Sequence, residues 1–224
     1  LRAVLSGYSL HFAAATDVDD GRGGRSLFGN LIATRLPVRQ ILRHQLPWPP
    51  DASVPSMARV ALEAVIQTKS GLIRVTCTHL EYYSPGIRTA QVRALRELHR
   101  QACARSRAPR PGRYAGDPFE AIDAPCAAII AGDFNFRPET PEYAELTAPF
   151  NDETPALADA WTLANPGRSR PPTFRLHDPN ADEAPYCCDF CFVSEDLAPR
   201  LLSVAVDETT QASDHQPIIV ELSD

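Results

Sequence analysis

The sequence predicts an α/β protein in which helices pack in layers against β-sheets. Several short segments rich in β-branched and apolar residues are typical of strands, and one long segment has clear helical periodicity. The chain has 224 residues, of which 44% are hydrophobic and 22% are charged, as expected for a globular protein with one sizeable core. We therefore expect residues 1–224 to form a single domain.

The predicted strands alternate with connections in which proline is frequent. Proline fixes its own backbone angle and removes a hydrogen-bond donor, so residues 45–56, 105–125 and 164–173 are expected to be loops. Residues 69–71, Lys-Ser-Gly, are expected to form a hairpin turn. The expected strands are residues 30–34, 58–68, 72–78, 126–130, 187–193, 201–206 and 217–222.

Two segments are predicted to be helical. Residues 87–103 carry apolar side chains at helical spacing on one stripe, with arginine and glutamate on the opposite side. The stripe consists of Val92, Leu95, Leu98 and Ala102. A shorter helix is expected over residues 140–146, with Thr140 as N-cap and Pro141 in the first helical position.

The net charge of the chain is not that of a typical nucleic-acid-binding protein, because it is −6. Arginine is nevertheless concentrated between Arg88 and Arg113, so a local positive surface stays open as an alternative. No apolar run approaches the ~20 residues needed to cross a bilayer, so no membrane span is predicted.

The six cysteines are expected to be reduced. Three of them fall in the strand-like run 186–193, where buried small side chains are a better interpretation than disulfides. Cys188 and Cys191 have the spacing of a zinc knuckle, but no second pair completes a tetrahedral site. Reduced thiols favour a cytoplasmic protein.

Polar side chains follow several predicted strands where a purely structural core would not need them. His79 ends one strand, and the run Gly-Asp-Phe-Asn places Asp133 and Asn135 at the end of another. Asp189 lies inside an apolar run, and Asp214 and His215 precede the last strand. Taken alone, the aspartate and asparagine residues are explained by turn chemistry, and His79 by a hydrogen-bonded position in the interior. Their combination in one small domain indicates a site.

The spacing of these residues suggests how they meet. Side chains alternate along a strand, so Asp133 and Asn135 are expected on one side and Phe134 on the other. Gly132 leaves room for a close approach to the backbone. The Asp189 carboxylate needs a partner inside an apolar run, and His215 would serve, because Asp–His pairs hold one imidazole tautomer.

These motifs resemble the endonuclease/exonuclease/phosphatase superfamily, which has the deoxyribonuclease-I-like fold. The resemblance covers roughly residues 27 to 222 and is carried by the segments beginning at Phe28, Thr78, Gly132, Tyr186 and Ser213. It implies a four-layer α-β-β-α sandwich of two mixed sheets. It also implies metal-dependent hydrolysis of phosphodiesters or phosphomonoesters, with Mg²⁺ or Mn²⁺ as the cofactor.

The resemblance also assigns roles to residues of this chain. Asp133 resembles the aspartate that orients or deprotonates the attacking water, and Asn135 resembles the asparagine that holds a phosphate oxygen. His215, oriented by Asp189, resembles the histidine at the scissile phosphate. His79 matches the second phosphate-side position. In a further correspondence, Asp214 matches a residue beside the metal, and sometimes a ligand of it.

One departure from the family pattern bears on activity. The pattern opens with an asparagine on a first strand and a metal-binding glutamate on a second, and the 224 residues contain neither. The chain is therefore expected to be N-terminally truncated and to lack the family's first strand-helix-strand unit. It is expected to bind magnesium weakly and to hydrolyse phosphate esters poorly or not at all.

The sequence leaves the substrate open. Arg88, Trp161 and Phe174 lie where the family binds substrate, although core packing explains the two aromatic residues equally well. The first hypothesis is a nuclease or phosphodiesterase. The alternatives are a phosphatase acting on a small phosphorylated ligand or lipid headgroup, and a catalytically silent binding domain.

Overall fold

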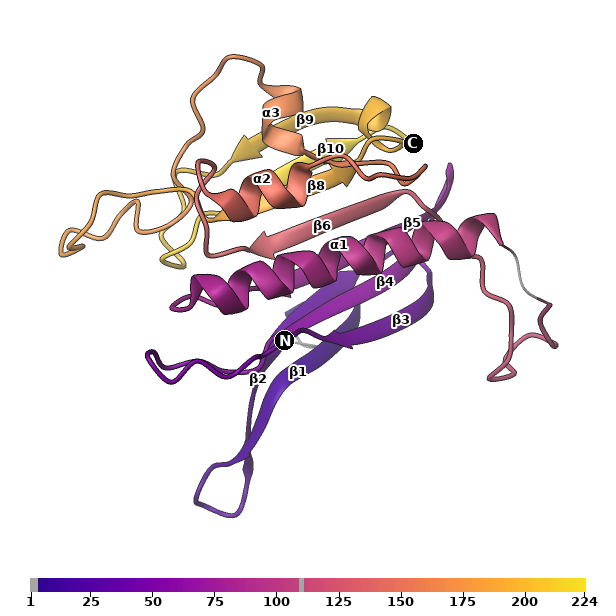
Figure 1. Ribbon diagram of the computed structural model, residues 1–224, viewed down its shortest axis with the longest axis horizontal. Coiled ribbons are helices and arrows are strands. Elements are labelled where there is room, and N and C mark those ends of the chain that lie inside the picture. Colours follow the sequence, from indigo (N-terminus) through magenta and orange to yellow (C-terminus); the bar gives the residue numbers. More distant parts are fainter. Residues whose placement is uncertain (1–3, 109–110) are drawn as a thin grey trace.

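A mixed six-stranded β-sheet organises the chain in the computed structural model, which describes residues 4–108 and 111–224 (Figure 1). Its strand order is β3-β4-β5-β6-β8-β7. The parallel pair is β5 with β6, and the other neighbouring strands are antiparallel. The bounds are β3 (Val38–Gln45), β4 (Val60–Thr68), β5 (Gly71–His79), β6 (Ala128–Asp133), β8 (Asp189–Ser194) and β7 (Leu157–Asp159).

Helices α1 (Pro85–Arg107) and α2 (Pro141–Thr147) cover one face of this sheet (Figure 1). Helix α1 begins where the Ser84 hydroxyl accepts a hydrogen bond from the Ile87 amide at 3.3 Å, as an N-cap does. Beneath the helices, the rings of Phe134, Phe190 and Phe192 pack against one another and are at most 1% exposed. This aromatic core anchors β6 and β8 side by side.

Two hairpins form the second β layer on the other side. They consist of β1 (Ser9–Asp19) with β2 (Arg25–Thr34), and of β9 (Leu201–Val206) with β10 (Ile218–Leu222). Ala13 and Ile32 pack on β4, and Val204 packs on β8 with the short helix α3 (Ala160–Ala164). Within the described residues the two hairpins remain separate two-stranded sheets.

The observed elements match the α/β architecture expected from the sequence. Every predicted strand and both predicted helices are present, with ends shifted by a few residues. The additional elements are β1, β3, β7, α3 and the 3₁₀ turn η1 (Ala198–Arg200). None of the helices in the described residues is both long and apolar enough to span a membrane.

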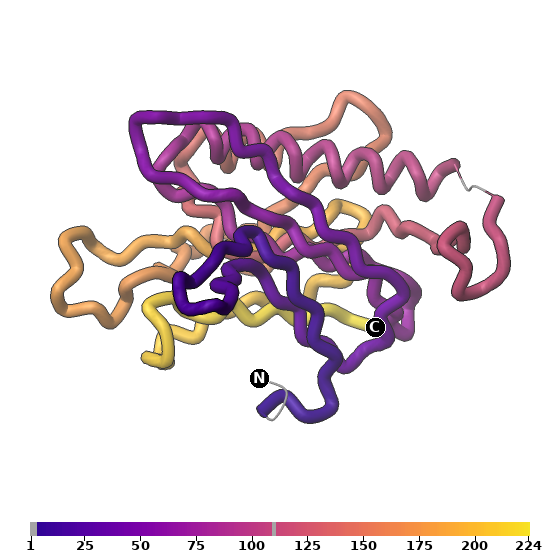
Figure 2. Tube along the Cα trace, turned by 90° about the horizontal axis from the view of Figure 1, so that it is seen from below, coloured from indigo at the N-terminus to yellow at the C-terminus, as the bar shows by residue number. Residues whose placement is uncertain are grey.

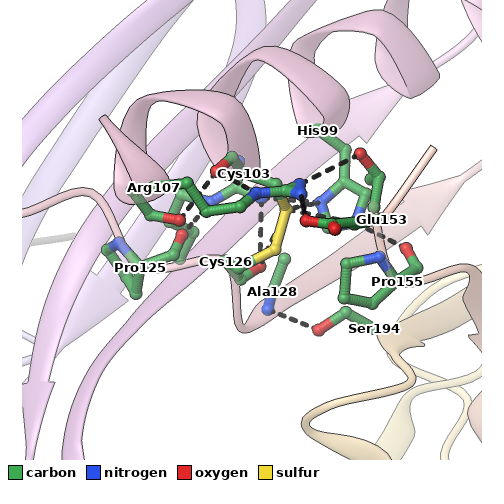
Figure 3. Close-up of a disulfide and its surroundings, with 12 residues drawn as sticks. His99, Cys103, Arg107, Pro125, Cys126, Ala128, Glu153, Pro155 and Ser194 are labelled. Atoms are coloured by element: carbon green, nitrogen blue, oxygen red, sulfur yellow. Dashed lines mark hydrogen bonds and ion pairs between the residues drawn. A yellow bond between two sulfur atoms is a disulfide. The ribbon is translucent and has the colours of Figure 1, made fainter. Parts of the chain in front are cut away.

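The expectation that all six cysteines are reduced is wrong. Cys103 in the last turns of α1 forms a disulfide with Cys126, which immediately precedes β6 (Figure 3). The two residues meet because α1 runs back along the sheet and the following loop returns to the start of β6. The free cysteines are Cys77, Cys187, Cys188 and Cys191.

Candidate active site

Three neighbouring strands deliver one polar residue each to the same edge of the sheet. His79 is the last residue of β5, Asp133 is the last of β6, and Asp189 is the first of β8. In the sheet register His79 pairs with Asp133, and Asp133 pairs with Asp189. The His79 Nε2 atom lies 3.3 Å from Asp133 Oδ2. Directly opposite positions bring side chains into contact, so the register itself builds this part of the site.

The turn after β6 explains why Gly132 precedes Asp133. Gly132 has φ +147°, and a Cβ atom there would lie 1.9 Å from the carbonyl oxygen of Thr78. Asp133 Oδ1 accepts a hydrogen bond from the Asn135 amide at 2.9 Å. Asn135 adopts φ 52° and donates from Nδ2 to the Leu80 carbonyl at 2.9 Å. The turn therefore holds the carboxylate and the amide side chain in fixed positions.

Asp189 is held by Thr173 and in turn orients His215. Its Oδ2 atom lies 2.8 Å from His215 Nδ1 and 2.7 Å from the Thr173 hydroxyl. The fully buried Thr173 oxygen also accepts the backbone amides of Cys188 and Asp189, each at 3.1 Å. Because Nδ1 is engaged, His215 presents Nε2 toward Asp133, 3.9 Å from its Oδ2 atom. Phe174 lies beside His215, with ring centroids 4.6 Å apart.

The charges of the site shift the pKa values of its groups in different directions. Burial and the facing Asp189 carboxylate raise the pKa of Asp133 to about 6. Burial, with positive charge at Arg59 and His215, lowers the pKa of His79 to about 4. The hydrogen bond that His215 donates to the Asp189 carboxylate raises the pKa of His215. At neutral pH the site therefore combines an ionised Asp133, a neutral His79 and a His215 that protonates readily.

The predicted site residues divide into two groups in space. His79, Asp133, Asn135, Asp189, His215 and Phe174 come together. The side chains of the other three predicted residues, Asp214, Trp161 and Arg88, are not part of this cluster.

The Asp214 side chain is exposed and accepts a hydrogen bond from Ser213 at 3.2 Å. Trp161 is half-buried in the core that α3 forms with β8 and β9. Arg88 is 8% exposed, and its guanidinium contacts Glu142 at 3.1 Å and two backbone carbonyls. Trp161 and Arg88 therefore have positions that are typical of structural residues.

Several residues at this edge escaped prediction. Arg59 and Glu81 are 5% and 1% exposed, and Arg59 Nε lies 3.9 Å from Glu81 Oε2. The Phe28 ring lies 5.7 Å from the His79 ring. The signal available in sequence was an arginine opening a strand, and a glutamate two residues after His79. Thr173 gave no signal apart from its place beside Phe174.

Most of the arginine-rich segment lies on α1, which starts near this edge and runs away from it, and Arg88 at its start is paired with Glu142. Residues 111–125 project at the end of the molecule opposite the start of α1 (Figures 1 and 2). Arg93 pairs with Glu145 at 2.6 Å, Arg100 pairs with Glu97 at 2.7 Å, and Arg107 lies 3.4 Å from Glu153. Arg110 lies outside the described residues. Because these arginines already have acidic partners, they do not extend a free cationic surface toward the site.

The donor groups at the site fit a weakly held magnesium ion. Magnesium prefers oxygen ligands and retains several waters, so one carboxylate plus substrate oxygens can suffice. Asp133 and the amide oxygen of Asn135 are donors of this kind, and Asn135 already uses its nitrogen on Leu80. The residues at the site that could together hold a metal ion are Asp133, Cys188 and His215, which offer oxygen, sulfur and nitrogen.

The chain belongs to the Endonuclease/Exonuclease/phosphatase family, which it matches over residues 2–215. Family members are hydrolases acting on phosphate esters and typically use divalent metals. Comparison with curated proteins gives no significant match.

Solved structures share the fold. A Bacteroides vulgatus endonuclease/exonuclease/phosphatase superposes with a TM-score of 0.65 at 21% identity, covering 100% of this chain and 78% of the other. A mannosyl-6-phosphatase from Bacteroides thetaiotaomicron gives 0.66 at 19% identity, covering 100% and 79%. The Neisseria 3′ phosphatase NExo, bound to a product DNA hairpin, gives 0.63 at 18% identity, covering 99% and 82%.

Proposed function

We propose that the protein hydrolyses phosphate esters at the sheet edge formed by His79, Asp133 and Asp189. The observation that carries this proposal is the convergence on Asp133 Oδ2, with His79 Nε2 at 3.3 Å and His215 Nε2 at 3.9 Å. The carboxylate can take a proton from water, and the two imidazoles beside it, one of them oriented by a second carboxylate, can donate hydrogen bonds to a phosphate at the same point.

Each residue has a distinct task in this mechanism. Asp133, whose raised pKa makes it a better base than an ordinary carboxylate, removes a proton from the water that attacks phosphorus. Protonated His215 donates a hydrogen bond to a phosphate oxygen, and Asp189 stabilises its cationic form. Neutral His79 and the second amide hydrogen of Asn135 complete the set of donors. A divalent cation such as Mg²⁺ or Mn²⁺, held by Asp133 and Asn135, would supply charge stabilisation at the phosphate.

The charge balance of the site favours a small phosphodiester. A diester carries one negative charge at neutral pH, whereas a monoester carries ≈ −1.5 to −2. The cationic groups near the reacting residues are His215, the buried Arg59 and Arg175 beside Phe174, while the other arginines of α1 follow the helix away from the site. We therefore rank a small diester ahead of a monoester or lipid headgroup, and ahead of long duplex nucleic acid.

The direct experiment compares chromogenic and natural esters at saturating Mg²⁺ and Mn²⁺, because a single carboxylate holds these ions weakly. Bis(p-nitrophenyl) phosphate should be cleaved faster than p-nitrophenyl phosphate and faster than plasmid DNA. Asp133→Asn should lower kcat/KM by roughly 10²–10⁴-fold. Asp123→Asn, an exposed aspartate next to the far loop, serves as the matched control and should leave the rate unchanged.

Two outcomes would contradict the proposal. Equal rates in the wild type and Asp133→Asn would show that Asp133 takes no part in the reaction. Saturable binding of the diester with no hydrolysis at any cation concentration would instead support a catalytically silent binding domain.

The disulfide bears on the cellular compartment of the protein. Disulfides persist in oxidising environments and are rare in the cytosol. The Cys103–Cys126 bond therefore favours an extracytoplasmic or otherwise oxidising location over the cytoplasmic one predicted from the sequence.

A further inference from the structure

A cysteine thiol lies directly behind the catalytic groups. Cys188 is 1% exposed, and its Sγ atom lies 3.5 Å from Asp189 Oδ2. One ligand atom from each of Asp133, Cys188 and His215 lies within 4.8 Å of the other two. The adjacent Cys187 packs instead into the aromatic core. Cys188 is therefore the thiol that faces the reacting groups.

The imidazole of His215 has the arrangement of a metal ligand supported by a carboxylate. Asp189 occupies Nδ1 at 2.8 Å, which leaves the Nε2 lone pair free in the neutral ring. That Nε2 atom points toward Asp133 Oδ2, 3.9 Å away. Metal-bound histidines commonly pair their second nitrogen with a carboxylate, which fixes the tautomer and the ring orientation. Asp189 can therefore support His215 as a ligand without moving.

The donor set is typical of zinc and atypical of magnesium. Zinc accepts cysteine sulfur, histidine nitrogen and carboxylate oxygen in tetrahedral sites, whereas magnesium binds oxygen. Zinc–ligand bonds of 2.0–2.3 Å require donor separations of about 3.3–3.8 Å. The candidate ligand atoms lie within 4.8 Å of one another, so side-chain displacements of about 1 Å would bring them to that spacing. His79 Nε2, 3.3 Å from Asp133 Oδ2, is placed to join as a fourth donor or to leave that position to water.

We propose that Asp133, Cys188 and His215 bind a thiophilic divalent ion such as Zn²⁺, and that this ion excludes the catalytic one. Binding forms a sulfur–metal bond and releases the Cys188 thiol proton to solvent. The same ion occupies the Asp133 oxygen and the His215 nitrogen. Metal binding is independent of the proposed hydrolysis, while inhibition by zinc rests on it.

Cobalt(II) provides a spectroscopic test that needs no activity. Titration of the wild-type chain with Co²⁺ should produce a near-ultraviolet thiolate-to-cobalt charge-transfer band and the visible bands of a four-coordinate ion, and Zn²⁺ should abolish both. Cys188→Ser should remove the charge-transfer band and weaken Zn²⁺ binding by at least about tenfold, by analogy with the cost of losing supporting residues. Cys187→Ala is the matched control, because this neighbouring thiol is also buried, and its spectrum should equal the wild-type spectrum.

His215→Ala provides a second variant if Cys188→Ser fails to fold, since His215 lies in a partly exposed loop. It should also lower the Co²⁺ affinity, as read from the titration of these bands, by at least about tenfold. Absence of a charge-transfer band in the folded wild type, or its persistence in Cys188→Ser, would overturn the metal site. A chain that binds zinc but hydrolyses no ester would contradict the proposed function and leave the metal site standing.

Discussion

Two clusters of buried charge on the central sheet differ in how completely their polar atoms are paired. Arg74 on β5 is 2% exposed and donates to Glu63 at 3.0 Å, to His99 Nδ1 at 2.7 Å and to the Pro125 carbonyl at 2.9 Å. His99 Nε2 in turn donates to the Pro155 carbonyl at 3.0 Å. His99 lies beside the disulfide (Figure 3), and every side-chain nitrogen of Arg74 and His99 has a partner within the chain.

The polar pairing of the cluster around Arg59, near the proposed catalytic edge, is incomplete. Nε and Nη1 of Arg59 and Oε2 of Glu81 are buried without hydrogen-bond partners in the part of the chain that the structure describes. Asp133 in the same region has a raised pKa. Buried polar groups are normally satisfied, and exceptions concentrate at functional sites. The contrast indicates that Arg74 serves the fold, whereas Arg59 is placed for a ligand charge.

The largest expected effect separates these two arginines. Arg74→Met should lower the free energy of unfolding by ~3–5 kcal/mol, because it leaves Glu63 buried and uncompensated. Arg59→Met should cost less than Arg74→Met, because the contact of Arg59 with Glu81 at 3.9 Å is an ion pair without a hydrogen bond, and it should weaken phosphate binding. Urea denaturation followed by circular dichroism measures both variants. Equal losses of stability would erase the distinction between the clusters.

The disulfide should stabilise the structural end by a comparable but smaller amount. It closes a loop with a sequence separation of 23, so Cys103→Ser should lower the free energy of unfolding by about 3 kcal/mol. Thiol counting in denaturant without reductant should find four free cysteines in the wild type. A count of six would contradict the disulfide and would return the cytoplasm as the favoured compartment.

The pH dependence of stability should expose two opposing groups at the catalytic edge. Asp133, raised from 3.8 to about 6, makes the folded state bind more protons than the unfolded state, so its contribution falls as pH rises through that window. His79, lowered from 6.5 to about 4, makes the unfolded state bind more protons, so stability rises as pH rises through its window. In the wild type the two contributions oppose each other.

Single substitutions should separate the contributions of Asp133 and His79 to the pH dependence of stability. In Asp133→Asn, stability should rise by about 1–2 kcal/mol between pH 4 and 6.5, and in His79→Gln it should fall over the same window by a similar amount. Denaturant midpoints measured at half-unit pH steps would reveal these slopes. Flat profiles in both variants would mean that neither group is perturbed.

The sequence predicts the parts of the site that follow from strand periodicity and fails where contacts depend on loops. His79 and Asp133 end alternating apolar strands, and sheet pairing then makes them neighbours. Thr173 meets Asp189 only after the loop that carries it folds against the start of β8, and no local pattern marks it. Strand β3 escaped prediction because polar side chains interrupt its apolar residues at a half-exposed edge.

The disulfide was missed for a related reason. Cys103 and Cys126 are joined by the packing of α1 along the sheet, which residue spacing does not encode. Asp214 shows that adjacency in the sequence does not bring a side chain into the site. It is adjacent to His215 in sequence, yet its side chain stays in solvent, because neighbouring residues in an extended segment point in different directions.

The most direct test of the central claim is a carboxyl-carbon NMR titration of Asp133 in the wild type and in Asp189→Asn. If the two carboxylates face each other beside His215, Asp133 should titrate near pH 6 in the wild type. Removing the Asp189 charge should move its pKa downward. An Asp133 that titrates at its ordinary value of 3.8 in both proteins would show that the groups do not share one site.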